Sequence, residues 1–229
     1  MEIQGLQKLT LLDYPGKVAC TVFFGGCDLR CPFCHNSELV TTLAPAELDS
    51  EEFFSFLRKR IGLLDGVCIT GGEPLLRPDL EEFLAKVKEL GFLVKLDTNG
   101  THPQRLQALV EAKLVNYVAM DVKNGPSRYA ETTGISDLDL QPIRESVAYL
   151  LSGPIQYEFR TTVVREFHNR SSFVELGPWL AGARAYFLQS FVDRDTVLCP
   201  GLHPCSREEL EEFASLVRPY VPSVQLRGV

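Results

Sequence analysis

The loop Gly25-Gly26-Cys27-Asp28-Leu29-Arg30-Cys31-Pro32-Phe33-Cys34-His35-Asn36 follows an apolar run and carries three cysteines at C-x3-C-x2-C spacing. Cysteine thiolates hold iron–sulfur clusters, usually four to a cluster. Three in one loop, with no obvious fourth nearby, predict a cluster with one iron left open. An open coordination position is typical of catalytic metal sites. The spacing leaves a second hypothesis open, a zinc knuckle completed by a distant Cys or His.

The chain around this loop has 229 residues, of which 45% are apolar and 23% charged, a composition typical of globular proteins. We expect a single domain over residues 1–229. It divides into an N-terminal arm over 1–17, a core over about 18–195, and a C-terminal helix and tail over 206–229.

The charge and hydropathy of the sequence indicate which classes of partner to expect. A net charge of −7 disfavours a uniformly basic nucleic-acid binder. The sequence contains neither a run of 18 apolar residues nor an N-terminal signal-peptide pattern. We therefore expect no nucleic-acid partner, no membrane association and a cytoplasmic location.

Four of the seven cysteines lie outside the loop. Cys20 and Cys68 fall in strand-like runs and are expected to be buried free thiols. Cys199 and Cys205 lie in a Pro/Gly-containing loop. Plain loop cysteines are one interpretation of that pair, and redox activity or metal binding is the other.

Apolar and β-branched runs predict a series of strands separated by helices. Strands are expected at 18–24, 66–70, 92–96, 117–122, 155–164 and 185–192, with a leading strand or arm at 6–12 and a possible edge strand within 221–229. Helices are expected from Ser50, which can cap its helix, from Pro78, over 103–112, 141–151 and 171–181, and from Ser206, which opens a capping box. This alternation predicts an α/β fold with parallel strands. Periodicity alone leaves open a doubly wound sheet or a barrel.

Polar and glycine signals collect directly after the predicted strands. Gly71-Gly72-Glu73-Pro74 follows the second strand, Asp97-Thr98-Asn99-Gly100 the third, and Asp121 and Lys123 end the fourth. The carboxyl ends of parallel strands form the functional face of such folds. Two glycines allow close approach of a ligand, and Glu73 can accept a hydrogen bond from an ammonium group. The mixed charges suit a zwitterionic ligand. A turn and a structural ion pair are the alternatives for these motifs.

Together the cysteine motif, Phe33 before its third cysteine, and Gly71-Gly72-Glu73-Pro74 after the second strand resemble the radical S-adenosylmethionine (SAM) superfamily. The resemblance spans roughly residues 18–195 and implies a partial (β/α)6 TIM-like barrel, with parallel strands and helices outside.

A narrower resemblance is to the enzymes that activate glycyl-radical enzymes. It rests on Asp13-Tyr14-Pro15-Gly16, Cys34-His35-Asn36, Asp97-Thr98-Asn99-Gly100 and Asp121-Val122-Lys123. The opening Leu11-Leu12-Asp13-Tyr14-Pro15-Gly16-Lys17 is most similar to activators of anaerobic ribonucleoside-triphosphate reductase.

The resemblance implies that Cys27, Cys31 and Cys34 bind one [4Fe-4S] cluster whose fourth iron is chelated by the amino and carboxylate groups of S-adenosylmethionine. No cysteine occurs between residues 35 and 67, so a single cluster is expected.

The other implied roles concern the cofactor. The residues assigned to its methionine amino group are Gly71, Gly72 and Glu73, and those on its adenine side are Phe33, Cys34 and His35. Asp121 and Lys123, which are given a catalytic role, and Gln189 lie where activating enzymes contact the cofactor. Asp97, Thr98 and Asp121 match a monovalent-cation site.

The implied activity is an oxidoreductase of anaerobic metabolism. Reductive cleavage of S-adenosylmethionine produces a 5′-deoxyadenosyl radical, which abstracts a hydrogen from a glycine Cα in a partner glycyl-radical enzyme. Flavodoxin or ferredoxin is the expected electron donor. The alternatives are a radical enzyme acting on a small molecule, similar to 7-carboxy-7-deazaguanine synthase, and a non-catalytic metal-binding scaffold.

Overall fold

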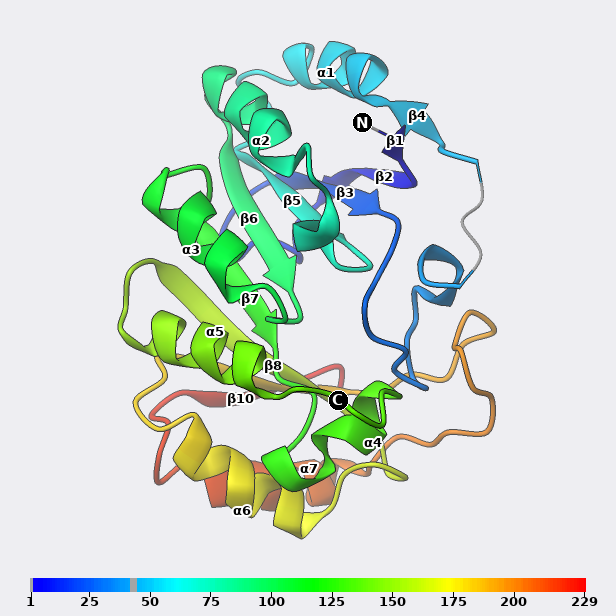
Figure 1. Cartoon of the computed structure of the whole chain (residues 1–229), viewed down its shortest axis with the longest axis vertical. Helices are drawn as coiled ribbons and strands as arrows, with labels where there is room; N and C mark the ends of the chain where they lie inside the picture. Colours follow the sequence, from blue (N-terminus) through cyan, green and yellow to red (C-terminus); the bar gives the residue numbers. More distant parts are fainter. Residues whose placement is uncertain (1, 42–44) are drawn as a thin grey trace.

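The computed structural model, which describes residues 2–41 and 45–229, contains an eight-stranded sheet (Figure 1). Its strand order is β10-β9-β8-β7-β6-β5-β3-β2. Neighbouring strands are parallel except for the antiparallel pair β2–β3. The strands are β2 (Gly5–Thr10), β3 (Ala19–Phe24), β5 (Gly66–Gly71), β6 (Leu93–Thr98), β7 (Tyr117–Asp121), β8 (Gln156–Val163), β9 (Tyr186–Ser190) and β10 (Val224–Arg227).

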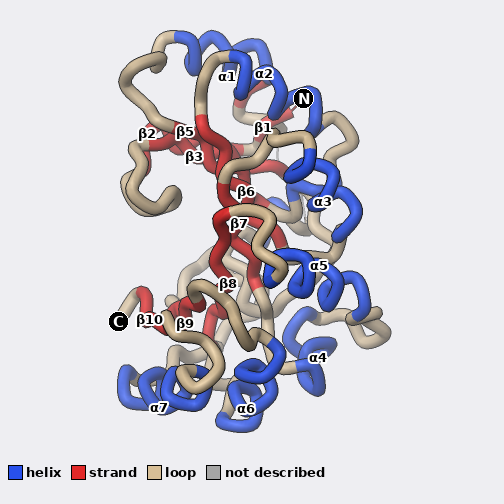
Figure 2. The backbone as a smooth tube through the Cα atoms, turned by 90° about the vertical axis from the view of Figure 1, so that its left-hand side faces the viewer, coloured by secondary structure: helices blue, strands red, loops and turns tan. Residues whose placement is uncertain are grey.

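From β3 to β10 the spatial order of the strands follows their order in the chain. A doubly wound sheet would instead reverse direction at a switch point. Figure 2 shows helices along one side of the strands and loops with the C-terminus on the other. The predicted α/β fold with a partial barrel and outer helices is confirmed. The six predicted core strands are confirmed to within two residues, and the predicted edge strand near the C-terminus is β10.

The crossover helices begin and end close to the predicted positions. They are α1 (Ser50–Arg58), α2 (Leu80–Glu89), α3 (Pro103–Glu111), α5 (Gln141–Leu151), α6 (Arg170–Trp179) and α7 (Arg207–Val217). Shorter elements, which the sequence reading missed, are β1 (Glu2–Ile3) paired with β4 (Leu48–Asp49), the 3-10 turns η1 (Ser37–Leu39), η2 (Pro74–Leu76) and η3 (Pro126–Arg128), and α4 (Tyr129–Thr133).

The prediction that Ser50 caps its helix is wrong. Ser50 is the first helical residue of α1, and Asp49 is its N-cap, because the Asp49 side chain accepts from the backbone N–H of Glu52 while Glu52 binds back. This reciprocal pair is a capping box, which Ser50 cannot form from inside the helix. The capping box predicted at Ser206 and Glu209 is confirmed at the start of α7.

The strands alternate between an apolar outer face and a polar inner face. On β6, Val94 and Leu96 are fully buried in the core shared with the helices, whereas Lys95 and Asp97 point the other way. The inner face therefore carries charged side chains close to the strand ends. Within the described residues, no helix combines the length and apolar character needed to cross a membrane.

Candidate active site

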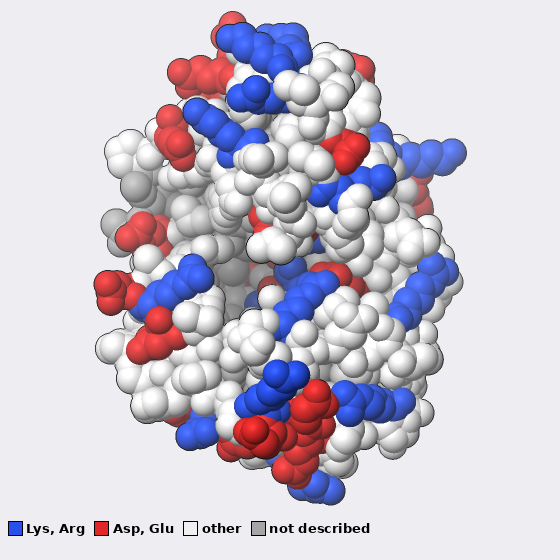
Figure 3. Space-filling view, turned by 180° about the vertical axis from the view of Figure 1, so that it is seen from behind, with Lys and Arg blue, Asp and Glu red and all other residues white. Residues whose placement is uncertain are grey.

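A cavity of about 500 Å³ lies where the parallel strands end. This volume is within the range of pockets that bind small ligands and cofactors. Figure 3 shows the molecule hollowed near the middle of one face, with acidic and basic atoms inside the hollow. The predicted site residues that line the cavity are Cys27, Cys31, Phe33, Cys34, His35, Gly71, Gly72, Asp97, Thr98, Asp121, Lys123 and Gln189.

Backbone contacts shape the loop that carries the three cysteines. Gly26 has a φ of +94°, a left-handed conformation that suits glycine. The N–H of Arg30 donates to the carbonyl of Thr133 at 2.9 Å, and the N–H of Cys34 donates to the carbonyl of Cys31 at 3.0 Å. The loop is thus turned so that all three cysteines line one cavity.

Two of the three thiols, those of Cys27 and Cys31, are suited to being neutral when free and charged when they bind a metal. Burial raises the pKa of Cys27 to about 12 and that of Cys31 to about 11, so both favour the neutral thiol until a metal withdraws the proton. Two donors already reach Cys27 Sγ: the N–H of Leu29 at 3.4 Å and Asn99 Nδ2 at 3.8 Å.

Among the residues that the structure describes, no group of three or more His, Cys, Asp or Glu side chains is arranged to hold a single metal ion. In a [4Fe-4S] cluster the thiolates bind separate irons, so three cysteines spread round one cavity fit that donor chemistry.

Two glycines bring the loop after β5 against the cysteine loop. A Cβ on Gly71, whose φ is +124°, would lie 2.1 Å from the carbonyl oxygen of Phe24, and one on Gly72 would lie 2.0 Å from that of Gly26. The N–H of Glu73 donates to the same Gly26 carbonyl at 2.8 Å. Both glycines line the cavity, and close backbone contact is the reason for them.

Glu73 differs from the other predicted residues because its carboxylate points into the protein and does not line the cavity. Its oxygens accept from the N–H of Leu75 at 3.0 Å, the hydroxyl of Thr98 at 3.0 Å and the N–H of Asn99 at 2.7 Å. Burial raises its pKa to about 7 against these donors. The expectation that this carboxylate accepts from a ligand ammonium is therefore corrected: it joins two walls of the cavity.

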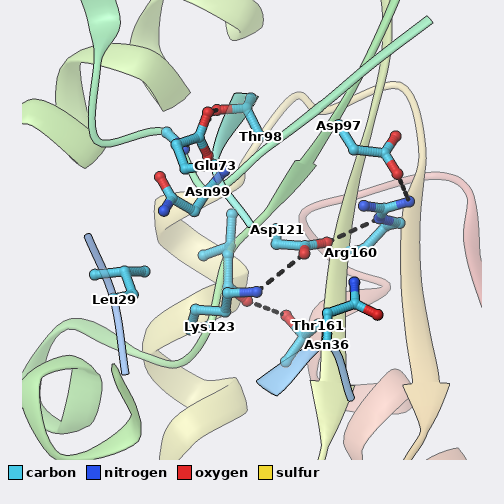
Figure 4. A network of polar contacts seen from close by, with 12 residues as sticks. Leu29, Asn36, Glu73, Asp97, Thr98, Asn99, Asp121, Lys123, Arg160 and Thr161 are labelled. Atoms are coloured by element: carbon cyan, nitrogen blue, oxygen red, sulfur yellow. Dashed lines mark hydrogen bonds and ion pairs between the residues drawn. The ribbon is translucent and has the colours of Figure 1, made fainter. Parts of the chain in front are cut away.

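Five charged side chains form a ladder of alternating sign on the inner face, which we call the charge ladder: Lys95, Asp97, Arg160, Asp121 and Lys123. Figure 4 shows the last four of them. Arg160 Nε lies 2.8 Å from Asp121 Oδ1, and its Nη1 lies 3.4 Å from Asp97 Oδ2. Lys123 Nζ lies 2.9 Å from Asp121 Oδ2, and Lys95 pairs with Asp97 Oδ1.

Neighbouring opposite charges in the ladder favour the ionised forms of Asp97, Asp121 and Lys123, although these side chains are mostly buried. Burial opposes ionisation of Asp121, but the charges of Arg160 and Lys123 hold its pKa below the usual range. The pKa of Asp97 is lowered in the same way by Arg160 and Lys95. Burial alone would lower the pKa of Lys123, and Asp121 instead raises it. Asp97, Asp121 and Lys123 therefore favour their charged forms at the cavity.

Phe33, His35 and Gln189 form another part of the cavity lining. Phe33 is buried, with its ring 5.9 Å from that of Phe167. The His35 ring stacks on Phe191 at 5.4 Å, and its Nε2 lies 2.6 Å from the carbonyl oxygen of Val192. Gln189 lies near the end of β9 and faces the same space.

Several cavity residues were missed from the sequence: Asp13, Leu29, Asn36, Val40, Thr70, Asn99, Arg160, Thr162 and Arg194. Arg160 is the most consequential, because it links both aspartates of the ladder. The sequence feature that could have identified it is a charged residue between Phe159 and Thr161, both buried, within a strand predicted to lie in the core. Asp13 belongs to the Asp13-Tyr14-Pro15-Gly16 motif, which indicates the family resemblance but not a place in the cavity.

The remaining cysteines lie as follows. Cys20 and Cys68 are buried free thiols, as predicted. Cys199 is exposed and Cys205 is buried, and both are free. The N–H of Cys199 donates to the carbonyl of Pro32 at 2.8 Å, so the segment around Cys199 packs on the cysteine loop.

Comparison with known proteins identifies the family of this chain. The model of the radical SAM superfamily matches residues 21–170. A protein of Methanocaldococcus jannaschii named "Putative glycyl-radical enzyme activating enzyme" is 29% identical over 99% of this chain and 96% of its own length. The pyruvate formate-lyase-activating enzyme of Clostridium pasteurianum is 33% identical over 53% of this chain and 52% of its own length.

Solved structures share the fold at low identity. SuiB of Streptococcus suis bound to S-adenosylmethionine superposes with a TM-score of 0.70 at 15% identity, over 91% of this chain and 52% of SuiB. A domain of pyruvate-formate lyase-activating enzyme from Bacteroides vulgatus superposes with a TM-score of 0.56 at 16% identity, over 71% of this chain and 99% of that domain.

Proposed function

This chain belongs to the radical SAM superfamily, and we propose that it activates a glycyl-radical enzyme by removing a hydrogen atom from a glycine Cα of that partner. The observation that carries the proposal is that three cysteines of one loop line the same cavity as four members of the charge ladder, Asp97, Asp121, Lys123 and Arg160. The relative in Methanocaldococcus jannaschii, whose name states this activity, aligns over nearly the whole of both chains.

In this proposal Cys27, Cys31 and Cys34 hold one [4Fe-4S] cluster. The cluster and S-adenosylmethionine, when bound, supply the electron and the 5′-deoxyadenosyl group for hydrogen abstraction. Burial of Cys31 keeps water away from that side of the site. The backbone N–H of Leu29 and the side-chain amide of Asn99 support the thiolate charge of Cys27.

The other walls hold S-adenosylmethionine in place. Lys123, fixed by Asp121, meets the polar end of the cofactor, and the backbones of Gly71 and Gly72 allow its methionine part to approach closely. Phe33, Cys34 and His35 cover its adenine side, and Gln189 contributes an amide from β9. The work of these residues is to orient the cofactor against the partner's glycine.

We further propose anaerobic ribonucleotide reductase as the partner, and a flavodoxin or ferredoxin as the electron donor. The partner assignment rests on the resemblance of residues 11–17 to activators of that reductase. Asp13 of this segment lines the cavity, held by a hydrogen bond from Thr21 Oγ1 at 2.6 Å. The segment therefore lies beside the space that a glycine loop would enter.

The test begins with anaerobic reconstitution with iron and sulfide, followed by reduction in the presence of S-adenosylmethionine. We expect 5′-deoxyadenosine and a cluster absorbance that Cys31→Ala abolishes and the exposed Cys199→Ala preserves. Full cluster content in Cys31→Ala would show that the ligand assignment is wrong, and no 5′-deoxyadenosine in the native protein would exclude the enzymatic proposal.

The partner is tested by electron paramagnetic resonance after mixing with an anaerobic ribonucleotide reductase. A glycyl-radical doublet is expected with the native protein and not with Lys123→Ala, whose cluster content should be intact. Turnover to 5′-deoxyadenosine without a doublet for any glycyl-radical enzyme would instead favour a small-molecule substrate.

A further inference from the structure

The charge ladder occupies the place where the sequence resemblance implied a monovalent cation. Each of the four carboxylate oxygens of Asp97 and Asp121 already has a cationic partner. Arg160 bridges the two residues, with Nε 2.8 Å from Asp121 Oδ1 and Nη1 3.4 Å from Asp97 Oδ2. A metal cation between the aspartates would compete with the guanidinium for the same oxygens.

The hydroxyl of Thr98, the third expected ligand of the cation, is also already hydrogen-bonded within the protein. The Thr98 hydroxyl donates to Glu73 Oε1 at 3.0 Å and accepts from the N–H of Gly100 at 3.1 Å. Thr98 is buried, and these two bonds direct its oxygen toward the Glu73 side. The donor set therefore does not fit Na⁺ or K⁺, which require several oxygen ligands free to turn toward one ion.

The charge count of the ladder points the same way. Lys95, Arg160 and Lys123 supply three positive charges against the two carboxylates of Asp97 and Asp121. One added carboxylate would neutralise this partly buried group, whereas an added cation would increase its excess charge. Burying unbalanced charge is unfavourable, so an anionic group is the better complement.

Arg160 also has the donors for such a group. A guanidinium has five N–H bonds in a planar fork that matches a carboxylate. Two of the five serve the aspartates, and no acceptor among residues 2–41 and 45–229 is hydrogen-bonded to the other three. The Arg160 side chain is 13% exposed, and it lines the cavity.

We propose that Arg160 replaces the monovalent cation and binds the carboxylate of S-adenosylmethionine directly, so that cofactor binding needs neither Na⁺ nor K⁺. This inference rests on the proposed function, since it concerns the same cofactor. It makes Arg160 a cofactor-binding residue that no motif in the sequence marks.

The test measures S-adenosylmethionine binding by isothermal titration calorimetry on the cluster-loaded, unreduced protein. The titration is repeated in sodium, potassium and choline chloride at equal ionic strength. We expect the Kd of the native protein to change by less than about threefold among the three salts. This comparison needs no variant, so it holds even where a substitution disturbs folding.

A variant arm tests the guanidinium itself. Arg160→Gln should weaken binding by about tenfold or more in all three salts, because charge-assisted bonds to the carboxylate are lost. Arg165→Gln is the matched control, since Arg165 is an exposed arginine paired with Glu209 at 2.8 Å and lies outside the cavity. Its Kd should equal that of the native protein. Cluster absorbance and thermal unfolding verify that each variant is loaded and folded.

Two results would overturn the inference alone. One is a native Kd that tightens by about threefold or more in sodium or potassium chloride relative to choline chloride. The other is a folded, loaded Arg160→Gln that binds within about threefold of the native protein. No binding in any salt by fully loaded native protein would overturn the proposed function, and this inference with it.

Discussion

The carboxylate of Glu73 accepts a hydrogen bond from the backbone N–H of Asn99 at 2.7 Å, across 26 residues of chain. The same oxygen pair also binds the Thr98 hydroxyl and the N–H of Leu75. One buried side chain thus joins the loop after β5 to the loop after β6. The walls of the cavity keep their spacing because of this link.

Replacing Glu73 should therefore destabilise the protein. Glu73→Ala leaves three buried donors without an acceptor, and the free energy of unfolding should fall by about 3 kcal/mol. Urea unfolding followed by circular dichroism measures the change. Glu82→Ala is the matched control, because Glu82 is an exposed helical residue paired with Lys86, and it should unfold as the native protein does. Equal stability of the Glu73 and Glu82 variants would contradict the linking role.

Asn99 should tune the cluster held by Cys27. Its Nδ2 lies 3.8 Å from Cys27 Sγ and donates to Asp28 Oδ1 at 2.8 Å. Asn99→Leu removes a donor to the thiolate, which destabilises the more negative reduced cluster. A loss of about 1 kcal/mol lowers the one-electron reduction potential by about 40 mV.

A redox titration monitored by electron paramagnetic resonance gives the potential of the Asn99→Leu protein. The exposed Gln225→Ala should keep the native value. An unchanged or raised potential in Asn99→Leu would show that this amide does not act on the cluster.

Stability in mild acid should depend on His168. Its Nε2 lies 2.8 Å from the carbonyl oxygen of Lys123, and the N–H of Val164 donates to its Nδ1 at 3.1 Å. Burial lowers the pKa of His168 from 6.5 to about 4. Between these values the unfolded chain binds the extra proton, so stability is complete above pH 6.5 and declines as the pH falls toward 4.

Over that range the shift corresponds to a loss of up to about 3 kcal/mol. Urea unfolding at a series of pH values should show a smaller loss in His168→Gln than in the native protein. Gln225→Ala, at an exposed residue without a titratable group, should retain the native slope. Parallel curves for the native and His168→Gln proteins would mean that burial of this imidazole is not the cause.

The two cavity glycines should differ sharply from glycines elsewhere. Gly71→Ala places a Cβ 2.1 Å from the Phe24 carbonyl oxygen and should cost more than about 3 kcal/mol. Gly91→Ala is the matched control, since Gly91 also has a positive φ, of +87°, but no atom within 4 Å of the added Cβ. It should cost about 1–2 kcal/mol, the strain of a left-handed residue. Similar losses in the two variants would show that the backbone contact with Phe24 yields easily.

Much of the fold could be predicted because its signals are local. Runs such as 66–70 and 92–96 are apolar over strand length, and helices such as α7 carry their capping box in four consecutive residues. The cysteine loop was recognisable for the same reason. The Asp49 cap was missed because the two candidates, Asp49 and Ser50, are neighbours, and only the turn geometry separates them.

The site was predicted less completely, because the register between paired strands cannot be deduced from the local sequence pattern. Arg160 meets Asp121 since β7 and β8 pair with those two residues side by side. Glu73 was expected in the cavity, and the turn at η2 directs it inward. The alternation of residues along a strand indicates which face of the sheet each side chain is on, but not which residue of the adjacent strand it will lie beside.

The sequence by itself determined that this is an α/β chain with three thiols in one loop and polar residues after its strands, because each of those features depends on residues close together in the sequence. Tertiary structure alone decided which of these groups meet. It closed the ladder from Lys95 to Lys123 through Arg160, and it turned Glu73 away from the cavity. The physical reason is that ion pairs and buried hydrogen bonds depend on distances between strands, which sheet order and register set only after the chain has folded.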